Sequence, residues 1–480
     1  MMLADIITIL PEITIAVAAM VVMLSDLFFG KYVKNLAYIL TQIFLIIAAW
    51  MTFEQFVSPV YVGFGGQTYS NDFTFILQEF IFLAAFLVFI YGKDYIEDRK
   101  LPQGEFYTLS LLSILGAVTL VSAYSLLTVY IGLELLSLPL YALLAIRRNF
   151  AKGAEASIKY FILGAITSGL LLYGMSFIYG ITGSLNLHDI GIYLANTNPA
   201  HLNIVLVGMV LMITTATFKL GAVPFHMWVP DVYEGSPNAV TAFLASVPKL
   251  AAFAMLVNIL MVAMPAQAFA WHKVLMVLGV ISIFFGNLLA LAQTNLKRLL
   301  GYSTISHIGF VLLALILSPD AFAVSTALFY IIVYILMAAA SFGVLIVLSV
   351  KGNDVEDLVD FAGLNRRNPW IAFLMLILMF SMAGIPPLSG FVAKLFVVMG
   401  LIDGHHYVLV TYALIMSVIA SFYYIRVVKV IYFDEPKNQT PVYANKNTLL
   451  GLSINSLLIL IFGLFPALLV NLIHPVYTLF

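Results

Sequence analysis

Residues 370–402 read WIAFLMLILMFSMAGIPPLSGFVAKLFVVMGLI, and this stretch decides the fold. Both of its ends are apolar, while Gly384, Pro386 and Pro387 stand where a continuous helix cannot pass. As one helix the run would be about 48 Å long, against roughly 30 Å of hydrocarbon in a bilayer. We therefore predict two half-helices joined by an irregular segment.

A second stretch is broken in a similar way. Residues 214–237 read TTATFKLGAVPFHMWVPDVYEGSP, with Gly221 and Pro224 interrupting an apolar run. A lysine lies beside each break, Lys219 in this run and Lys394 in the first. Discontinuous helices of this kind are typical of ion-translocating folds, in which freed backbone groups line a polar path.

The composition is that of a membrane protein. Of the 480 residues, 63% are hydrophobic and 9% are charged, whereas soluble domains carry about 25% charged residues. The net charge of −1 excludes nucleic-acid binding through a basic surface. The absence of cysteine excludes disulfides, thiolate zinc sites and Cys-ligated iron–sulfur clusters. The fold class is therefore all-α integral membrane.

Apolar runs bounded by polar or Gly/Pro clusters predict about 14 transmembrane helices. These lie near residues 7–29, 35–57, 74–92, 106–123, 125–146, 154–180, 203–222, 239–264, 274–293, 299–317, 322–350, 370–402, 407–432 and 449–472.

The distribution of Lys and Arg predicts the orientation, because short cytoplasmic loops are enriched in them. Of the 22 basic residues, 17 fall in one set of alternate loops, and Lys273 alone falls in the other. This bias places both termini on the outer, periplasmic side and supports an even number of helices. The 17 are Lys31, Lys34, Lys93, Arg99, Lys100, Arg147, Arg148, Lys152, Lys297, Arg298, Lys351, Arg366, Arg367, Arg426, Lys429, Lys437 and Lys446.

The two broken helices are each fourth in a unit of five, which predicts two repeats. Because five is odd, successive units enter the membrane from opposite faces, so the repeats are inverted. We predict an N-terminal three-helix segment at 1–103, a first inverted repeat (helices 4–8) at 104–264, a second (helices 9–13) at 265–433, and helix 14 within 434–480.

Four charged residues lie deep in apolar runs: Glu134, Lys219, Lys249 and Lys394. Each costs about 2.5 to 3.5 kcal/mol at the centre of a membrane, on the order of 10 kcal/mol together. Buried ion pairs that fix helix register would explain some of them, but three lysines cannot all pair with one central carboxylate. An amine in an apolar environment releases its proton more readily, so the pattern favours a proton relay.

Other polar residues in the runs are more ambiguous. Lys159 is one turn after Glu155 near a helix end, so a side chain reaching to the interface explains it as well as a relay does. His307 lies one turn after Ser303 and either continues a hydrogen-bonded chain or is a satisfied packing histidine. Glu12 and Glu79 stay open between packing and function.

Several long motifs resemble a known family. They are GLELLSLPLYALLAI around Glu134, FKLGAVPFHMWVPDVYEGSPNAVTAFLASVPKLAAF from Phe218 onward, NLKRLLGYSTISHIGF, and MAGIPPLSGFVAKLF. Across residues 70 to 435 the chain resembles the antiporter-like subunits of proton-pumping NADH:quinone oxidoreductase, respiratory complex I. The DVYEGSP and SVPK motifs are most similar to those of the subunit N type.

The resemblance implies roles for residues of this chain. Glu134 and Lys219 would form a coupled pair, Lys249 would be the central relay lysine, and Lys394 would hand protons outward. Quinone reduction elsewhere would perturb the pair and set the proton in motion. The chain itself would carry no cofactor, because FMN, iron–sulfur clusters and quinone would be held by partner subunits.

The same resemblance implies a multi-pass protein of the bacterial inner membrane. Its partners would be the lipid bilayer, antiporter-like subunit M and small membrane subunits of the complex. Two alternatives stay open at this stage. A multisubunit cation/proton antiporter shares the fold and the Glu and Lys positions, and a redox subunit would bind quinone or haem directly. The missing cysteines and paired histidines count against the redox subunit.

Overall fold

The computed structural model describes residues 2–56, 61–148, 150–196, 201–317, 320–349, 354–436 and 444–478. The predicted all-helical membrane fold is confirmed, since helices occupy all fourteen predicted runs. Among the described residues, 12 helices are long and apolar enough to span a bilayer. The two runs outside that set are α14 (Leu296–Ala314), which carries Lys297, Arg298 and several hydroxyl residues, and the broken run at 370–402. Fourteen crossings and the inverted repeats stay predictions.

The described residues form two compact units. Unit 1 comprises Met1–Phe86, Leu101–Leu220 and Val247–Leu275. Unit 2 comprises Leu87–Lys100, Gly221–Ser246 and Met276–Phe480. The division groups residues by packing, so the repeat boundaries predicted from the sequence stay a prediction.

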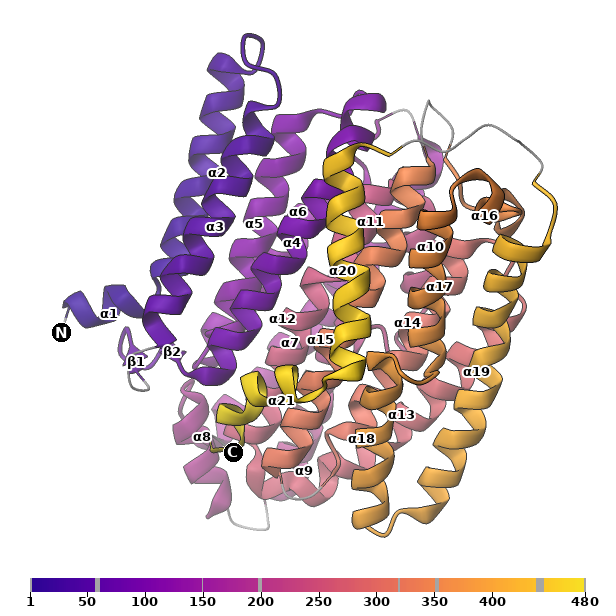
Figure 1. Ribbon diagram of the computed structural model, residues 1–480. Helices are drawn as coiled ribbons and strands as arrows, with labels where there is room; N and C mark the ends of the chain where they lie inside the picture. Colours follow the sequence, from indigo (N-terminus) through magenta and orange to yellow (C-terminus); the bar gives the residue numbers. More distant parts are fainter. Residues whose placement is uncertain are drawn as a thin grey trace. The chain divides into compact units, whose positions relative to one another are not determined.

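Unit 1 is a set of long helices with one short hairpin (Figure 1). Within it, α6 packs against α5 and α7, and α9 packs against α7 and α12. Its elements are α1 (Met2–Thr8), α2 (Leu10–Phe29), α3 (Leu36–Phe56), β1 (Tyr61–Gly63), β2 (Thr68–Ser70), the first part of α4 (Asp72–Asp98), α5 (Gln103–Val121), α6 (Leu126–Leu144), α7 (Ala151–Thr182), α8 (Leu187–Ala195), α9 (Leu202–Leu220), α12 (Val247–Val257), the π-helix Asn258–Ala263, the 3₁₀ helix Pro265–Gln267 and the start of α13 (Ala268–Leu291).

Unit 2 is built around α15, which is buried within the protein over its apolar length. Helices α14, α18 and α20 pack on it, and α17 packs on α19. Besides the rest of α4 and α13, its elements are α10 (Trp228–Gly235), α11 (Asn238–Leu244), α14, α15 (Asp320–Leu348), the 3₁₀ helix Leu358–Phe361, α16 (Leu364–Arg367), α17 (Pro369–Ala383), α18 (Ser389–Asp403), α19 (Tyr407–Phe433), α20 (Lys446–Leu464), α21 (Ala467–Ile473) and the 3₁₀ helix His474–Thr478.

Both predicted breaks are confirmed. Helix α9 ends at Leu220 and α10 begins at Trp228, while α17 ends at Ala383 and α18 begins at Ser389. At each break the first residue after the helix is a glycine with positive φ, Gly221 at 89° and Gly384 at 85°. Left-handed glycines end helices in this way because they carry no Cβ to clash with the backbone.

The run predicted as one helix at 239–264 is interrupted as well. Helix α11 ends at Leu244, α12 begins at Val247, and a π-helix follows at Asn258–Ala263. Pro248 explains the first interruption, because a proline ring clashes with the carbonyl four residues earlier, here that of Leu244. The interruption directly precedes Lys249.

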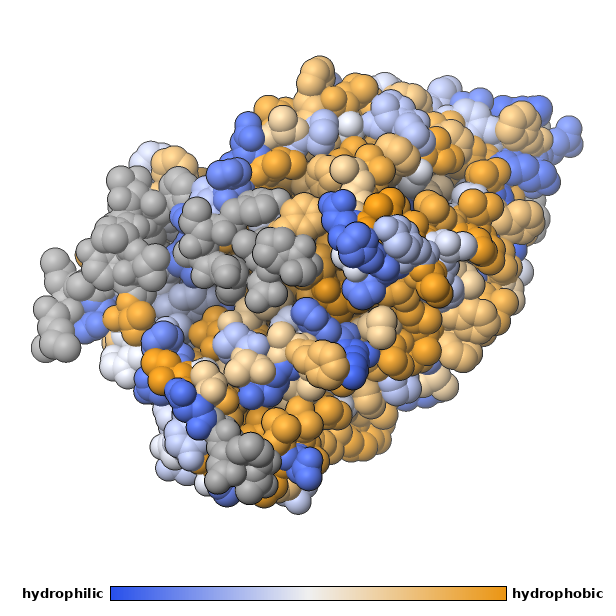
Figure 2. Space-filling model, turned by 90° about the horizontal axis from the view of Figure 1, so that it is seen from below, coloured by the Kyte–Doolittle hydropathy of each residue, from blue (hydrophilic) through white to orange (hydrophobic). Residues whose placement is uncertain are grey.

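Large apolar side chains are exposed on helices of both units. Leu27 and Trp50 in unit 1 and Val418 and Phe433 in unit 2 are all more than half exposed. Figure 2 shows hydrophobic side chains covering wide areas of one face, between patches of polar ones. Exposed apolar surface on this scale is expected of a protein that contacts lipid or other membrane subunits.

Candidate functional site

Lys219 lies one residue before the end of α9, in the interior of unit 1. Its Nζ donates a hydrogen bond to Ser137 Oγ at 2.8 Å. It also lies 5.0 Å from the ring centre of Tyr160 and 5.5 Å from that of Tyr141. Aromatic faces attract a cation, so this pocket holds an ammonium group without a direct carboxylate partner.

Glu134 lies on α6 one helical turn before Ser137. Glu134 therefore lies on the same stretch of α6 as the hydroxyl that binds Lys219. Glu134 Oε1 is buried and has no hydrogen-bond partner among the described residues. The structure thus brings the two predicted partners to the same place, with the Ser137 hydroxyl bound to the lysine and one carboxylate oxygen left to accept a proton or a water.

Lys249 lies on α12 and is fully buried. Its Nζ donates to the backbone carbonyls of Lys219 at 3.0 Å and Leu220 at 2.7 Å. These are the last two carbonyls of α9, which have no partner within the helix because the chain breaks at Gly221. The partial negative charge of a helix C-terminus favours a cation at this position. The side chain of Lys249 thus binds the backbone of Lys219, the residue whose own side chain binds Ser137.

Lys394 makes the corresponding contacts in unit 2. Its Nζ donates to the carbonyls of Met382 at 3.1 Å and Ala383 at 3.0 Å, the last two of α17. The two preceding carbonyls, of Phe380 and Ser381, accept from the backbone N–H of Gly384. All four carbonyls at the end of α17 are therefore satisfied, and a titratable amine binds two of the four.

Gly384 controls the approach of Lys394. A Cβ at this position would lie 2.9 Å from Lys394 Cδ and 3.3 Å from its Nζ, at a φ that costs other residues about 1 kcal/mol or more. We expect Gly384→Ala to displace the ammonium and to lower several-fold the proton translocation that the resemblance implies. Gly169→Ala in α7 is the control, because a Cβ there meets nothing within 4 Å. Equal translocation by the two variants would show that Lys394 works without its close packing against Gly384.

His307 lies on α14 in a chain of hydroxyl groups. Its Nδ1 lies 2.9 Å from the Tyr330 hydroxyl and its Nε2 lies 3.1 Å from that of Tyr424, which in turn is hydrogen-bonded to Ser303. Because imidazole and phenol can each both donate and accept, this chain can pass a proton. The sequence spacing predicted that Ser303 lies near His307. It could not predict the two tyrosines, because they come from other helices, α15 and α19.

Lys159 is placed differently from the other lysines. It is half-exposed on α7 and forms an ion pair with Glu155 at 2.8 Å, one turn earlier on the same helix. The next residue, Tyr160, faces Lys219. The geometry therefore favours the interfacial reading of Lys159, and a relay role stays a prediction.

Lys297 is a functional candidate that the sequence did not single out, because it was counted with the loop lysines. Only 1% of its surface is exposed. Its Nζ donates to the carbonyls of Glu234 and Ser236 and to Glu356 Oε1 at 3.1 Å. The next residue, Arg298, binds Asp231 and Glu234, both at 2.9 Å. The NLKR motif thus binds the DVYEGSP segment. The basic charges of one motif and the acidic charges of the other were the sequence signal that could have predicted this contact.

Removing Lys297 should therefore destabilise unit 2. Lys297→Met removes the charged donor to Glu356 Oε1 and to the carbonyls of Glu234 and Ser236, at a cost of about 3–5 kcal/mol. Arg298→Ala breaks more exposed pairs, which are worth about 1 kcal/mol. We expect thermal unfolding of the purified protein at a clearly lower temperature for Lys297→Met than for Arg298→Ala. The reverse order would show that Lys297 does not hold this segment.

The comparisons with known proteins agree on one family. The model of the NADH:quinone oxidoreductase/Mrp antiporter transmembrane family matches residues 123–420. NADH-quinone oxidoreductase subunit N of Francisella tularensis subsp. holarctica is 52% identical over 476 residues, 98% of each chain. The chain belongs to the NADH-quinone oxidoreductase subunit N family. The subunit of the same name from Coxiella burnetii is 44% identical over 473 residues, 97% of each chain.

Solved structures agree with this family. A chain of respiratory complex I from Thermus thermophilus with bound aureothin is 30% identical, with a TM-score of 0.81, covering 96% of this chain and 98% of that one. A chain of the Mrp complex from Dietzia sp. has a TM-score of 0.87 at 20% identity, covering 100% and 97%. The Mrp likeness shows the fold alone, whereas the subunit N relatives favour a subunit of NADH:quinone oxidoreductase over a subunit of a cation/proton antiporter.

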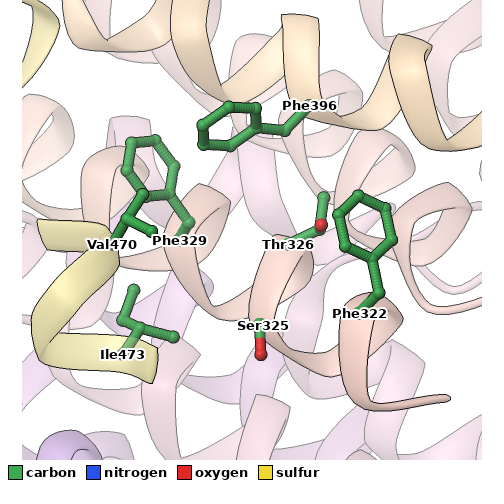
Figure 3. Close-up of a pocket in the computed structure, with 7 residues that line it drawn as sticks. All are labelled: Phe322, Ser325, Thr326, Phe329, Phe396, Val470 and Ile473. Carbon is green, nitrogen blue, oxygen red and sulfur yellow. The ribbon is translucent and has the colours of Figure 1, made fainter. Parts of the chain in front are cut away.

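One pocket lies among helices of unit 2. Figure 3 shows a pocket of about 210 Å³ between α15, α18 and α21, lined by Phe322, Ser325, Thr326, Phe329, Phe396, Val470 and Ile473. Ligand pockets usually measure about 300 Å³ or more, and this lining offers two hydroxyls as its polar groups. In the described part of the chain, no three His, Asp or Glu side chains converge as a metal site.

Proposed function

We propose that this chain is a membrane subunit of NADH:quinone oxidoreductase that carries protons across the membrane, driven by quinone reduction on other subunits. The observation that carries the proposal is the pair of lysines, Lys249 and Lys394, that hold the freed carbonyls at the ends of α9 and α17. A buried amine held by carbonyl dipoles is stable when charged and can lose its proton when the local field changes. Membership of the subunit N family supports the coupling to NADH oxidation.

In unit 1, Lys219 and Glu134 set the charge state of the site. The Glu134 carboxylate, one turn from the serine that binds Lys219, stabilises the ammonium because opposite charges attract. Protonation or displacement of Glu134 removes that support, so Lys219 gives up its proton to water. Lys249, bonded to the Lys219 carbonyl, responds to the same change because like charges disfavour each other.

In unit 2, Lys394 and His307 form the second proton-holding group. Lys394 holds the carbonyls at the end of α17, and the ring of His307 is hydrogen-bonded to two tyrosines. A proton on Lys394 can leave through water or along these hydroxyls. The neutral amine, still beside the carbonyls of α17, can then bind another proton. We assign the outward transfer to Lys394.

The chain itself supplies no redox chemistry in this proposal. FMN, iron–sulfur clusters and quinone belong to partner subunits, consistent with a chain that has no cysteine. The distribution of Lys and Arg places both termini on the outer side of a bacterial inner membrane. Antiporter-like subunit M and small membrane subunits are its neighbours.

Purification of the tagged chain from native membranes in mild detergent tests the proposal. We expect it to bring down flavin absorbance and NADH:quinone reductase activity in constant proportion to the tagged chain. A chain that purified without flavin and instead restored sodium/proton exchange to vesicles would make it a subunit of a cation antiporter.

A further inference from the structure

Glu12 is a buried carboxylate that the proposed mechanism does not use. It lies in the first turn of α2 with 7% of its surface exposed. Its Oε1 accepts hydrogen bonds from Ser122 Oγ at 2.7 Å and from Gln78 Nε2 at 3.2 Å. Its Oε2 is buried and has no hydrogen-bond partner among the described residues. Both donors use the same oxygen, so packing alone would be served equally well by a glutamine at this position.

The surroundings of Glu12 connect it to the helix that carries Lys249. Asn258, fully buried at the start of the π-helix, accepts from the Tyr69 hydroxyl at 2.6 Å. Its Nδ2 donates to the carbonyls of Val121 and Ala123, on either side of Ser122. The Tyr69 N–H binds the carbonyl of Ser122, whose hydroxyl reaches Glu12. Within unit 1, Tyr69 and the backbone around Ser122 therefore connect Asn258, at the start of the π-helix that follows α12, to Glu12.

Two features of this network point to proton movement. Lys249 and Asn258 are nine residues apart on one helical run, about 14 Å along its axis. The π-helix begins at Asn258, and such segments are frequent at functional sites because they leave backbone groups unpaired. In an otherwise apolar bundle, a titratable group at the end of such a network is a functional site by default.

We propose that Glu12 is a further proton-holding residue, which receives protons from the Lys249 side of unit 1 and releases them at the end of the unit where α2 begins. The carboxylate takes a proton from water at Oε2 to become the acid, and then returns it to water at the surface, with no electron transfer. This inference rests on the proposed function and on the orientation that places the N-terminus outside. It gives unit 1 an exit of its own, separate from Lys394.

The test compares Glu12→Gln, Glu12→Asp and Glu79→Gln in purified complex reconstituted into vesicles. Glutamine keeps an acceptor for Ser122 and Gln78 but cannot bind or release a proton. Glu79 is a matched control, since it also accepts from one hydroxyl, Thr52 Oγ1 at 2.6 Å. We expect Glu12→Gln to lower the protons translocated per NADH, and their rate at least about threefold, with Glu12→Asp in between and Glu79→Gln unchanged.

Infrared difference spectra on adding NADH give a second, structural readout. We expect a carbonyl-stretching band of a protonated carboxylic acid that is absent in Glu12→Gln and shifted in Glu12→Asp. Wild-type translocation by assembled Glu12→Gln would overturn the inference. If Glu12→Gln fails to assemble, an unshifted band set in Glu12→Asp overturns it as well. The proposed function fails separately, through normal pumping by Lys219→Ala.

Discussion

Lys219→Ala should lower NADH-driven proton translocation to less than about a tenth of wild type, at equal amounts of assembled complex. The substitution removes the ammonium that binds Ser137 and faces Tyr160. It also removes the proposed charge partner of Glu134. The measurement is the initial proton gradient formed by inverted membrane vesicles after addition of NADH. NADH oxidation should slow with it, because the two processes are coupled.

Two variants separate loss of the proton from loss of packing. Ser137→Ala removes the hydrogen bond but keeps the ammonium, so it should pump at a reduced but substantial rate. Lys273→Ala removes an exposed lysine of α13 that stacks on Phe269 and should pump like wild type. Normal pumping and NADH oxidation by Lys219→Ala would mean that the Lys219 and Glu134 pair is purely structural.

Lys394→Ala should be as severe, and Lys394→Glu should retain more pumping than Lys394→Ala. Alanine leaves the carbonyls of Met382 and Ala383 buried without a donor. A glutamic acid in its protonated form can donate to one of these carbonyls, and its loss of that proton replaces the titration of the amine. We expect Lys394→Ala at less than about a tenth of wild type and Lys394→Glu clearly above it.

The comparison must be made at equal complex levels between roughly pH 6 and pH 8, where a shifted carboxyl would titrate. His307→Gln serves as a companion variant, since it keeps one acceptor and one donor near Tyr330 and Tyr424 but cannot carry a charge. If Lys394→Glu proves as inactive as Lys394→Ala throughout, the mechanism uses the positive charge of Lys394 rather than its capacity to titrate.

The broken helices could be predicted because proline lacks the N–H that a helix needs, and because glycine readily takes the left-handed conformation that ends a helix. Gly384 and the two prolines after it exclude a continuous helix, and Gly221 does the same for α9. The same rule would have predicted the interruption before Lys249, since Pro248 excludes a hydrogen bond to Leu244. Membrane depth likewise singled out the buried charges, because their cost there demands a reason.

The partners of these charges could not be predicted, because tertiary packing chooses them. Nothing local tells that Lys249 binds the end of α9, 29 and 30 residues away, or that Lys219 binds a serine rather than Glu134. The tyrosines around His307 come from α15 and α19. Lys297 shows the opposite error, since a lysine at the start of a helix reads as exposed until its carbonyl partners are seen.

The central claim is that lysines bound to the ends of broken helices carry the protons that this chain moves. Lys249→Met tests it most directly, because methionine keeps the length and packing of the side chain while removing the amine that binds two α9 carbonyls. The measurement is the number of protons translocated per second by purified complex in lipid vesicles, with reduction of its flavin by NADH as the check on assembly. The account predicts normal flavin reduction and translocation below about a tenth of wild type, whereas wild-type translocation by Lys249→Met would contradict it.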